Sequence, residues 1–326
     1  MFSSILLRVI TSLVFALNIF TLQALRTTSI HQKKNLFNPR EQSKKSPAVC
    51  VIGTPKCGTH LLMKCITELD IKGLSYNYAK EAKTTSIKKI RRINQKQPPN
   101  HYKGVYYPTL KGILPRILTS NLINRTTQRL FFTHCPYLAE FDRFLQSQTF
   151  SNFLMIRDPR AMVVSFAFMV HKSIEGRTAD LEKTILSMIT GGQKDYVPWA
   201  VEQHEMYPLI WEIGLYNFYK MYLPWATAKN FMLIKFEDLI GEKGGGSAQK
   251  QFQTIMKIGQ HLDSKMTSQK AQAVINNLFG GTWTFREGKI DSWKTYFTPK
   301  VQQAFKQDIR LTKLLIELGY EEDTNW

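Results

Sequence analysis

The chain has 326 residues, of which 43% are hydrophobic and 12% aromatic. This supplies enough apolar side chains for the core of one large domain or two modest ones, so a wholly disordered chain is excluded. Its 4 cysteines are too few and too scattered for a disulfide framework. Lys and Arg number 44 against 25 Asp and Glu, a formal charge of +19, and such a basic chain usually meets an anionic partner.

The surplus of positive charge lies in the N-terminal part of the chain. Residues 1–130 hold 22 basic and 4 acidic residues, whereas residues 131–326 hold 22 and 21. Any function of the surplus charge is therefore expected before residue 131.

Residues 1–25 form a hydrophobic N-terminal segment. Its stretch 5–25 is about long enough to cross a bilayer, which takes roughly 20 residues. We expect membrane association through this segment as a single-pass anchor, and a cleaved signal peptide is the alternative. Residues 26–47 form a basic linker, which by the positive-inside rule favours a cytosolic position for the domain that follows. A lumenal or secreted position stays open.

The folded domain is predicted over residues 48–326. Short apolar runs typical of buried strands alternate with helical patterns, and these runs cover residues 48–52, 129–133, 153–156 and 231–236. Such alternation predicts an α/β fold, a three-layer sandwich in which a central parallel sheet has helices on both faces.

The turn after the first predicted strand has the composition of an anion-binding loop. It runs from Gly53 to His60 and keeps the glycine spacing G-x-x-x-x-G of nucleotide-binding P-loops. The Lys-Ser/Thr pair that follows the second glycine in those loops is missing, and Lys56 stands inside the loop instead. Backbone N–H groups at the start of the next helix, together with Lys56, would stabilise a phosphate or sulfate there.

Four ordered segments resemble the sulfotransferases that use 3′-phosphoadenylyl sulfate (PAPS). TPKCGTHLL (54–62) resembles their P-loop-like phosphosulfate-binding loop, and FLMIRDPR (153–160) with Ser165 resembles their 3′-phosphate motif. TFREGKIDSWK (284–294) is similar to the segment that closes over the cofactor, and LIKFEDL (233–239) to their Y-E-D-L strand end. The resemblance covers about residues 48–321 and implies cofactor binding by Lys56, Cys57, Gly58, Thr59, His60, Arg157, Ser165, Arg286, Glu287 and Gly288.

The resemblance also implies the chemistry. The sulfuryl group of PAPS would pass to a hydroxyl, or less favourably an amine, and leave adenosine 3′,5′-bisphosphate, with no metal required. THCP (133–136) resembles the family segment whose histidine is the general base, a role that suits the ordinary histidine pKa of about 6.5. The catalytic residues are thus expected to be His134, as the base, and Lys56, which stabilises the leaving phosphate. The acceptor class is left open among small molecules, carbohydrates and lipids, as is a homodimer.

Five residues depart from the family pattern. His60 replaces a loop hydroxyl, Leu61 an adenine-stacking tryptophan, and Phe132 a lysine before T-H. Phe236 stands in place of tyrosine, and Glu287 in place of the lysine of R-K-G.

Three other functions are weighed against sulfuryl transfer. A metal site would use Cys57, His60, His134 and Cys135, but His134 and Cys135 point to opposite sides of an extended strand. A kinase would need Glu237-Asp238 as magnesium ligands. A basic membrane- or polyanion-binding module without catalysis would use residues 80–96. No base-stacking motif accompanies the charge there, so nucleic acid is not expected as a partner.

Overall fold

The computed structural model describes residues 48–72, 74, 130–147, 150–172, 180–192, 209–282 and 285–326. These residues belong to one compact unit, Ser46–Trp326. The predicted N-terminal segment, the basic linker and the basic stretch 80–96 lie outside the described residues. Membrane association and the position of the domain therefore stay predictions. Within the described ranges, no helix has both the length and the apolar character that a bilayer crossing requires.

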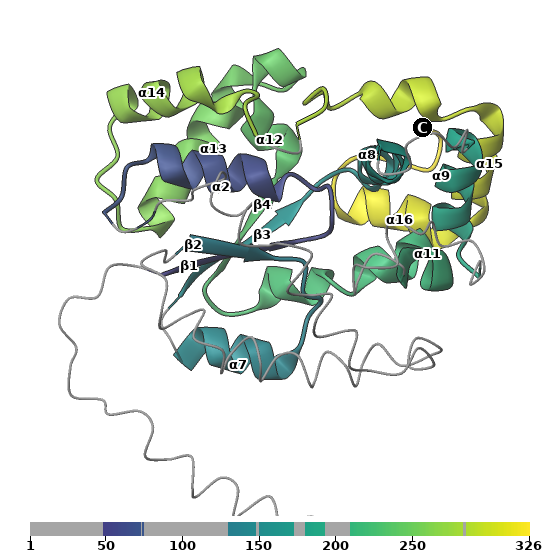
Figure 1. Cartoon of the computed structure of the whole chain (residues 1–326), viewed down its shortest axis with the longest axis horizontal. Coiled ribbons are helices and arrows are strands. Elements are labelled where there is room, and N and C mark those ends of the chain that lie inside the picture. The colour runs from purple at the N-terminus through teal and green to yellow at the C-terminus, as the bar shows by residue number, and fades with distance from the viewer. Residues whose placement is uncertain are drawn as a thin grey trace, which may run out of the picture. The chain divides into compact units, whose positions relative to one another are not determined.

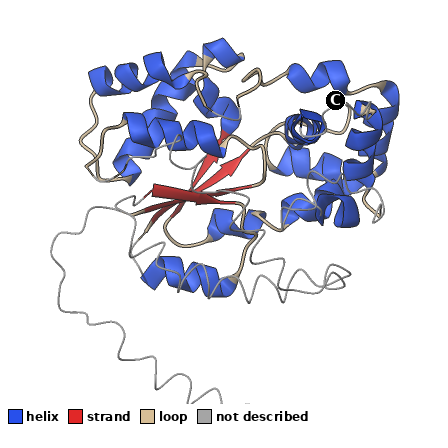
Figure 2. Ribbon diagram, in the orientation of Figure 1, coloured by secondary structure: helices blue, strands red, loops and turns tan. Residues whose placement is uncertain are grey.

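A four-stranded parallel sheet forms the centre of this unit, and helices surround it (Figure 2). The strands are β1 (Val49–Gly53), β2 (Leu130–Thr133), β3 (Ser151–Ile156) and β4 (Phe231–Lys235). Their order is β2-β1-β3-β4, with Ile52 opposite Thr133 on one side and opposite Leu154 on the other. The predicted strands are found within two residues of their expected ends. The difference at Phe236 arises because this residue begins a helix.

The helices follow the strands in chain order. Their bounds are α2 (Thr59–Glu68), α7 (Ala139–Ser147), α8 (Pro159–Lys172), α9 (Leu181–Thr190), α11 (Leu209–Lys220), α12 (Phe236–Ile240), α13 (Ala248–His261), α14 (Ser268–Leu278), α15 (Pro299–Gln307) and α16 (Ile309–Glu317). Three short 3-10 helices of the described residues are η2 (Leu223–Thr227), η3 (Glu242–Gly244) and η4 (Ser292–Tyr296).

The two faces of the sheet are covered by different helices, because successive side chains of a strand point to opposite faces. Cys50 and Ile52 pack in a core with α7, α8, α9, α11, α15 and α16. Val49 and Val51 pack in a second core with α2, α12, α13 and α14. Figure 1 shows α2, α13 and α14 on one side of the sheet and α7 on the other. The expected three-layer α/β architecture is confirmed.

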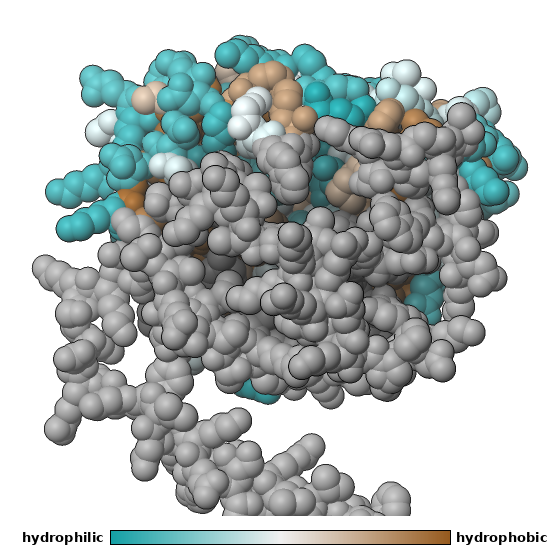
Figure 3. Space-filling view, viewed as in Figure 1, coloured by the Kyte–Doolittle hydropathy of each residue, from teal (hydrophilic) through white to brown (hydrophobic). Residues whose placement is uncertain are grey.

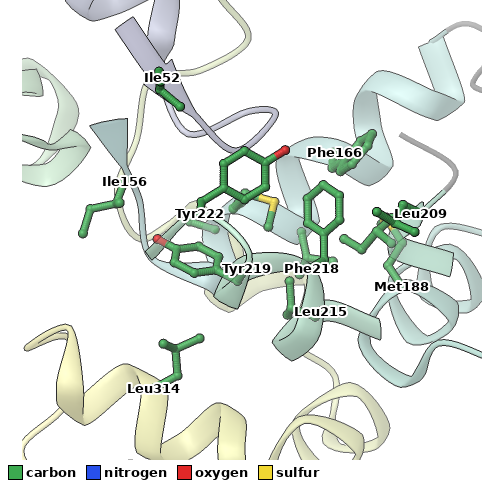
Figure 4. Packing of buried hydrophobic residues seen from close by; sticks show 14 of the residues in the cluster. Ile52, Ile156, Phe166, Met188, Leu209, Leu215, Phe218, Tyr219, Tyr222 and Leu314 are labelled. Carbon is green, nitrogen blue, oxygen red and sulfur yellow. The ribbon is translucent and has the colours of Figure 1, made fainter. Parts of the chain in front are cut away.

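The first of these cores is rich in aromatic residues. It contains Trp211, Tyr219, Tyr222 and Trp225, none of which is exposed to solvent. Figure 4 shows part of the cluster, with Tyr219 and Tyr222 near strand residues. On the face seen in Figure 3, the side chains that are not grey are mainly hydrophilic, with smaller hydrophobic areas among them. The hydroxyl of Tyr219 donates to the carbonyl of Arg157 and that of Tyr222 to the carbonyl of His134, so this core holds the residues that follow β3 and β2.

Candidate active site

The loop between β1 and α2 takes a backbone form that few residues adopt. Lys56 has a φ of 67° and Gly58, which precedes α2, has a φ of 106°. A Cβ at Gly58 would lie 2.6 Å from the Phe236 ring and 3.0 Å from the Met155 side chain. Only glycine fits at position 58, and the strained backbone of Lys56 is typical of functional loops.

The N-terminus of α2 has no side-chain cap, unlike those of α9, α13, α14, α15 and α16. Asp180, Ser247, Thr267, Thr298 and Asp308 each cap a helix with a side-chain oxygen. At α2, Gly58 supplies no side chain and the first turn holds no acidic residue. The positive end of this helix dipole therefore has no carboxylate of its own, which favours an anionic ligand.

Cys57 supports the loop from beneath. Its side chain is fully buried, and a Cβ on Gly53 would lie 2.5 Å from its sulfur. Burial raises the pKa of the Cys57 thiol to about 12, so the thiol is neutral at physiological pH. Cys57 can take part in ligand binding through its backbone, while its side chain packs in the core.

Arg157 follows β3 directly and lies under the loop. Its Nη1 donates to the carbonyl oxygen of Lys56 at 3.4 Å, and its Nη2 donates to that of Lys289 at 3.0 Å. The guanidinium lies 4.2 Å from the centre of the Phe236 ring. Only 7% of Arg157 is exposed, and burial lowers its pKa. Its buried Nε has no hydrogen-bond partner, so one donor remains for a ligand.

The helix after Arg157 and the C-terminal segment complete this side of the site. Ser165 lies on α8. One turn later on the same helix, the centre of the Phe168 ring lies 4.1 Å from the guanidinium carbon of Arg286. Gly288 has a φ of 65°, and a Cβ there would lie 2.6 Å from the Phe285 ring. Glycine at 288 is therefore needed for the backbone to pack against the Phe285 ring at this point of the segment.

His134 follows β2 and is tied to the neighbouring strand. Its Nδ1 lies 2.7 Å from the carbonyl oxygen of Gly53. A carbonyl oxygen only accepts hydrogen bonds, so Nδ1 carries the proton and Nε2 keeps its lone pair. The backbone of this segment is held in turn, because Tyr222 donates to the carbonyl of His134 at 2.8 Å and Trp225 to that of Cys135 at 3.1 Å.

A second histidine lies at the same pocket. The ring centres of His60 and Phe132 are 4.9 Å apart, and those of Phe132 and His134 are 5.7 Å apart. Burial, and then the nearby His134 and Lys56, lower the pKa of His60 to about 4. His60 is thus a neutral imidazole at physiological pH, unlike the hydroxyl that the family pattern has there.

One pocket joins the predicted residues from all these segments. Ten of the eleven line it, namely Lys56, Gly58, Thr59, His60, His134, Arg157, Ser165, Arg286, Glu287 and Gly288, and Cys57 does not. The lining also includes residues that the sequence reasoning did not assign: Leu61, Met169, Phe236, Ile240, Gly280, Thr282, Phe285, Lys289 and Ser292. Three of these (Phe285, Lys289 and Ser292) flank the predicted Arg286–Gly288, so their position in that segment was an available signal.

The acidic pair expected of a kinase lies outside the pocket. Glu237 is half-buried and accepts hydrogen bonds from the backbone N–H of Asp158 at 3.0 Å and from the hydroxyl of Tyr320 at 3.0 Å. Asp238 lies 3.5 Å from Lys250 at the surface. Over the described part of the chain, no three His, Cys, Asp or Glu side chains are grouped to hold a metal ion.

Comparison with known proteins shows the family. The sulfotransferase domain model matches residues 46–319, so the chain belongs to the sulfotransferase domain family. Among solved structures, the chain is similar to the mouse sulfotransferase SULT7A1 complexed with PAP, at 14% identity and a TM-score of 0.48. That match covers 81% of this chain and 83% of the mouse chain. None of the curated proteins compared with the chain matches it significantly.

Proposed function

We propose that this protein transfers the sulfuryl group of PAPS to the hydroxyl of an acceptor molecule. The observation that carries the proposal is the single pocket that gathers a base, an anion-binding loop and four cations. The base is His134, and the cations are Lys56, Arg157, Arg286 and Lys289. These groups come from four separate parts of the chain and belong to a sulfotransferase domain.

The residues present fit the chemistry of a bisphosphorylated sulfonucleotide. The uncapped N-terminus of α2 suits the phosphosulfate group. Arg157, with its unpartnered Nε, and Ser165 of α8 line the same pocket and suit a second phosphate. When bound, PAPS would supply an activated sulfuryl group whose bond to the 5′-phosphate oxygen breaks during transfer.

His134 would accept the proton of the acceptor hydroxyl. Nε2 carries the lone pair that this step needs, because Nδ1 donates its proton to the carbonyl oxygen of Gly53. The same hydrogen bond stabilises the imidazolium that forms when Nε2 takes up the proton.

Lys56 would neutralise the negative charge that builds on the leaving phosphate. Its loop lies over Arg157, which donates to the carbonyl of Lys56 and so holds the loop in place. A fixed charge in a partly buried site stabilises a developing anion more strongly than a solvated one.

Sulfate transfer itself is the test of the proposal. Purified protein is incubated with PAPS labelled in the sulfuryl group and with a panel of phenolic, alcoholic, amine and carbohydrate acceptors. We expect a labelled product together with stoichiometric adenosine 3′,5′-bisphosphate. Phosphate transfer from ATP, with no transfer from PAPS to any acceptor and no affinity for adenosine 3′,5′-bisphosphate, would show the proposal to be wrong.

A further inference from the structure

Glu287 carries the only carboxylate among the pocket-lining residues that the structure describes. Its Oε1 lies 2.5 Å from Nη1 of Arg286, the residue before it. A carboxylate at an anion-binding pocket opposes the binding of phosphate unless a cation neutralises it. The pairing of Glu287 with Arg286 therefore needs a functional explanation.

Arg286 is held in a defined position by aromatic rings. Its guanidinium lies 4.1 Å from the centre of the Phe168 ring and 5.9 Å from that of Tyr296. Phe168 lies on α8, the helix that also presents Ser165 to the pocket. Arg286 can thus exchange one anion for another with little movement of its own, because the stacking fixes the plane of its donors.

Arg157 and Arg286 are close enough to repel each other. The charge of Arg286 is one of the causes that lower the pKa of Arg157, after burial. An anion between or beside them relieves this repulsion. In the ligand-free protein, Glu287 supplies a compensating negative charge at Arg286.

We propose that Glu287 determines how strongly the pocket prefers nucleotides that carry a 3′-phosphate. Its carboxylate occupies Arg286 in the free protein and competes with that phosphate for the same guanidinium. This lowers the affinity for adenosine 3′,5′-bisphosphate and favours its release after transfer. The inference rests on the proposed function, because it assumes that the pocket holds such a nucleotide with its 3′-phosphate in reach of Arg286, which lines the pocket together with Arg157 and Ser165.

The test compares the full-length protein with Glu287→Gln, which keeps the shape and removes the charge. Calorimetry measures the Kd of adenosine 3′,5′-bisphosphate and of adenosine 5′-monophosphate, which lacks the 3′-phosphate. We expect Glu287→Gln to bind the bisphosphate about three- to tenfold more tightly, with the monophosphate unchanged. Asp291→Asn is the matched control, because Asp291 pairs with the exposed Lys294 and does not line the pocket.

The double variant Arg286→Gln/Glu287→Gln separates competition from a general change in charge. We expect Glu287→Gln to bring no gain in affinity for the bisphosphate when it is added to Arg286→Gln, because the guanidinium for which the carboxylate competes is then absent. An unchanged or weaker affinity for the bisphosphate in Glu287→Gln, or an equal gain for both nucleotides, would overturn the proposal. If the wild-type protein binds neither nucleotide, both the proposed function and this inference fail. If the wild type prefers the bisphosphate but Glu287→Gln shows no selective gain, only this inference fails and the proposed function stands.

Discussion

The side chain of His134 and the backbone of Gly53 join the ends of two neighbouring strands by a hydrogen bond of 2.7 Å. Gly53 ends β1 and His134 follows β2, 81 residues further along the chain. The bond selects the imidazole tautomer whose Nε2 can accept a proton. The same glycine begins the loop that carries Lys56, so the predicted base and the predicted cation are positioned by one strand end.

Removal of His134 should abolish transfer without loss of nucleotide binding. For His134→Ala we expect kcat to fall about 10²- to 10⁴-fold, the usual contribution of a general base. The Kd of adenosine 3′,5′-bisphosphate, measured by calorimetry, should stay near that of the wild type. His171→Gln is the control, because His171 hydrogen-bonds Thr184 and does not line the pocket. Full activity of His134→Ala would remove the assignment of the base.

Removal of Lys56 should affect the chemical step. We expect Lys56→Ala to raise the activation barrier by about 2–4 kcal/mol, as the loss of one donor to a developing oxyanion does. Single-turnover sulfate transfer measures this effect without the contribution of product release. Lys250→Ala provides the comparison, because Lys250 is a surface lysine beside Asp238. A barrier equal in the two variants would show that Lys56 does not stabilise the leaving group.

The half-buried His60 should make the free energy of unfolding depend on pH. Its pKa is lowered from 6.5 to about 4 in the folded protein, so the unfolded chain binds the proton more readily between these values. The free energy of unfolding should therefore decrease as the pH falls from 6.5 toward 4, by on the order of 3 kcal/mol from this group. Urea unfolding of wild type and His60→Gln across this range measures the difference. Equal pH slopes in the two proteins would contradict it.

Gly58 should tolerate no side chain. In Gly58→Ala the Cβ meets the Phe236 ring at 2.6 Å in a backbone with φ of 106°, and we expect about 2–4 kcal/mol of lost stability. Because the displaced ring also contacts Arg157, nucleotide affinity should fall as well. Gly192→Ala is the control, since φ there is 71° but no atom lies within 4 Å of the added Cβ. Thermal unfolding of both should show the larger loss for Gly58→Ala.

The strands and the loop followed from local patterns in the sequence. Short apolar runs bounded by glycine or charged residues predicted all four strands of the sheet, because a strand covered on both faces needs apolar side chains at every position. The predicted end at Phe236 was wrong by one residue, because an apolar side chain fits equally well in a strand or in the first turn of the buried helix α12.

The protonation and hydrogen bonding of the site residues could not be predicted from local sequence patterns. The tautomer of His134 depends on the carbonyl of Gly53, and the low pKa of His60 depends on burial and on the nearby His134, which follows another strand. The kinase hypothesis for Glu237 could be tested only with the structure, which shows this carboxylate accepting a hydrogen bond from Tyr320. Such properties depend on partners distant in the sequence.

The net charge of +19 follows from the sequence, but it does not show which cations lie in the pocket. Short-range patterns predict the parallel α/β architecture and the glycine-rich loop after β1, because periodicity, glycine spacing and strand–turn–helix order act over short distances. The arrangement of the cations in the pocket depends on the fold, which buries Arg157 against Phe236 and pairs Arg286 with Glu287. Desolvation and charge pairing depend on the distances between folded elements, which come into existence only when the sheet brings the strand ends together.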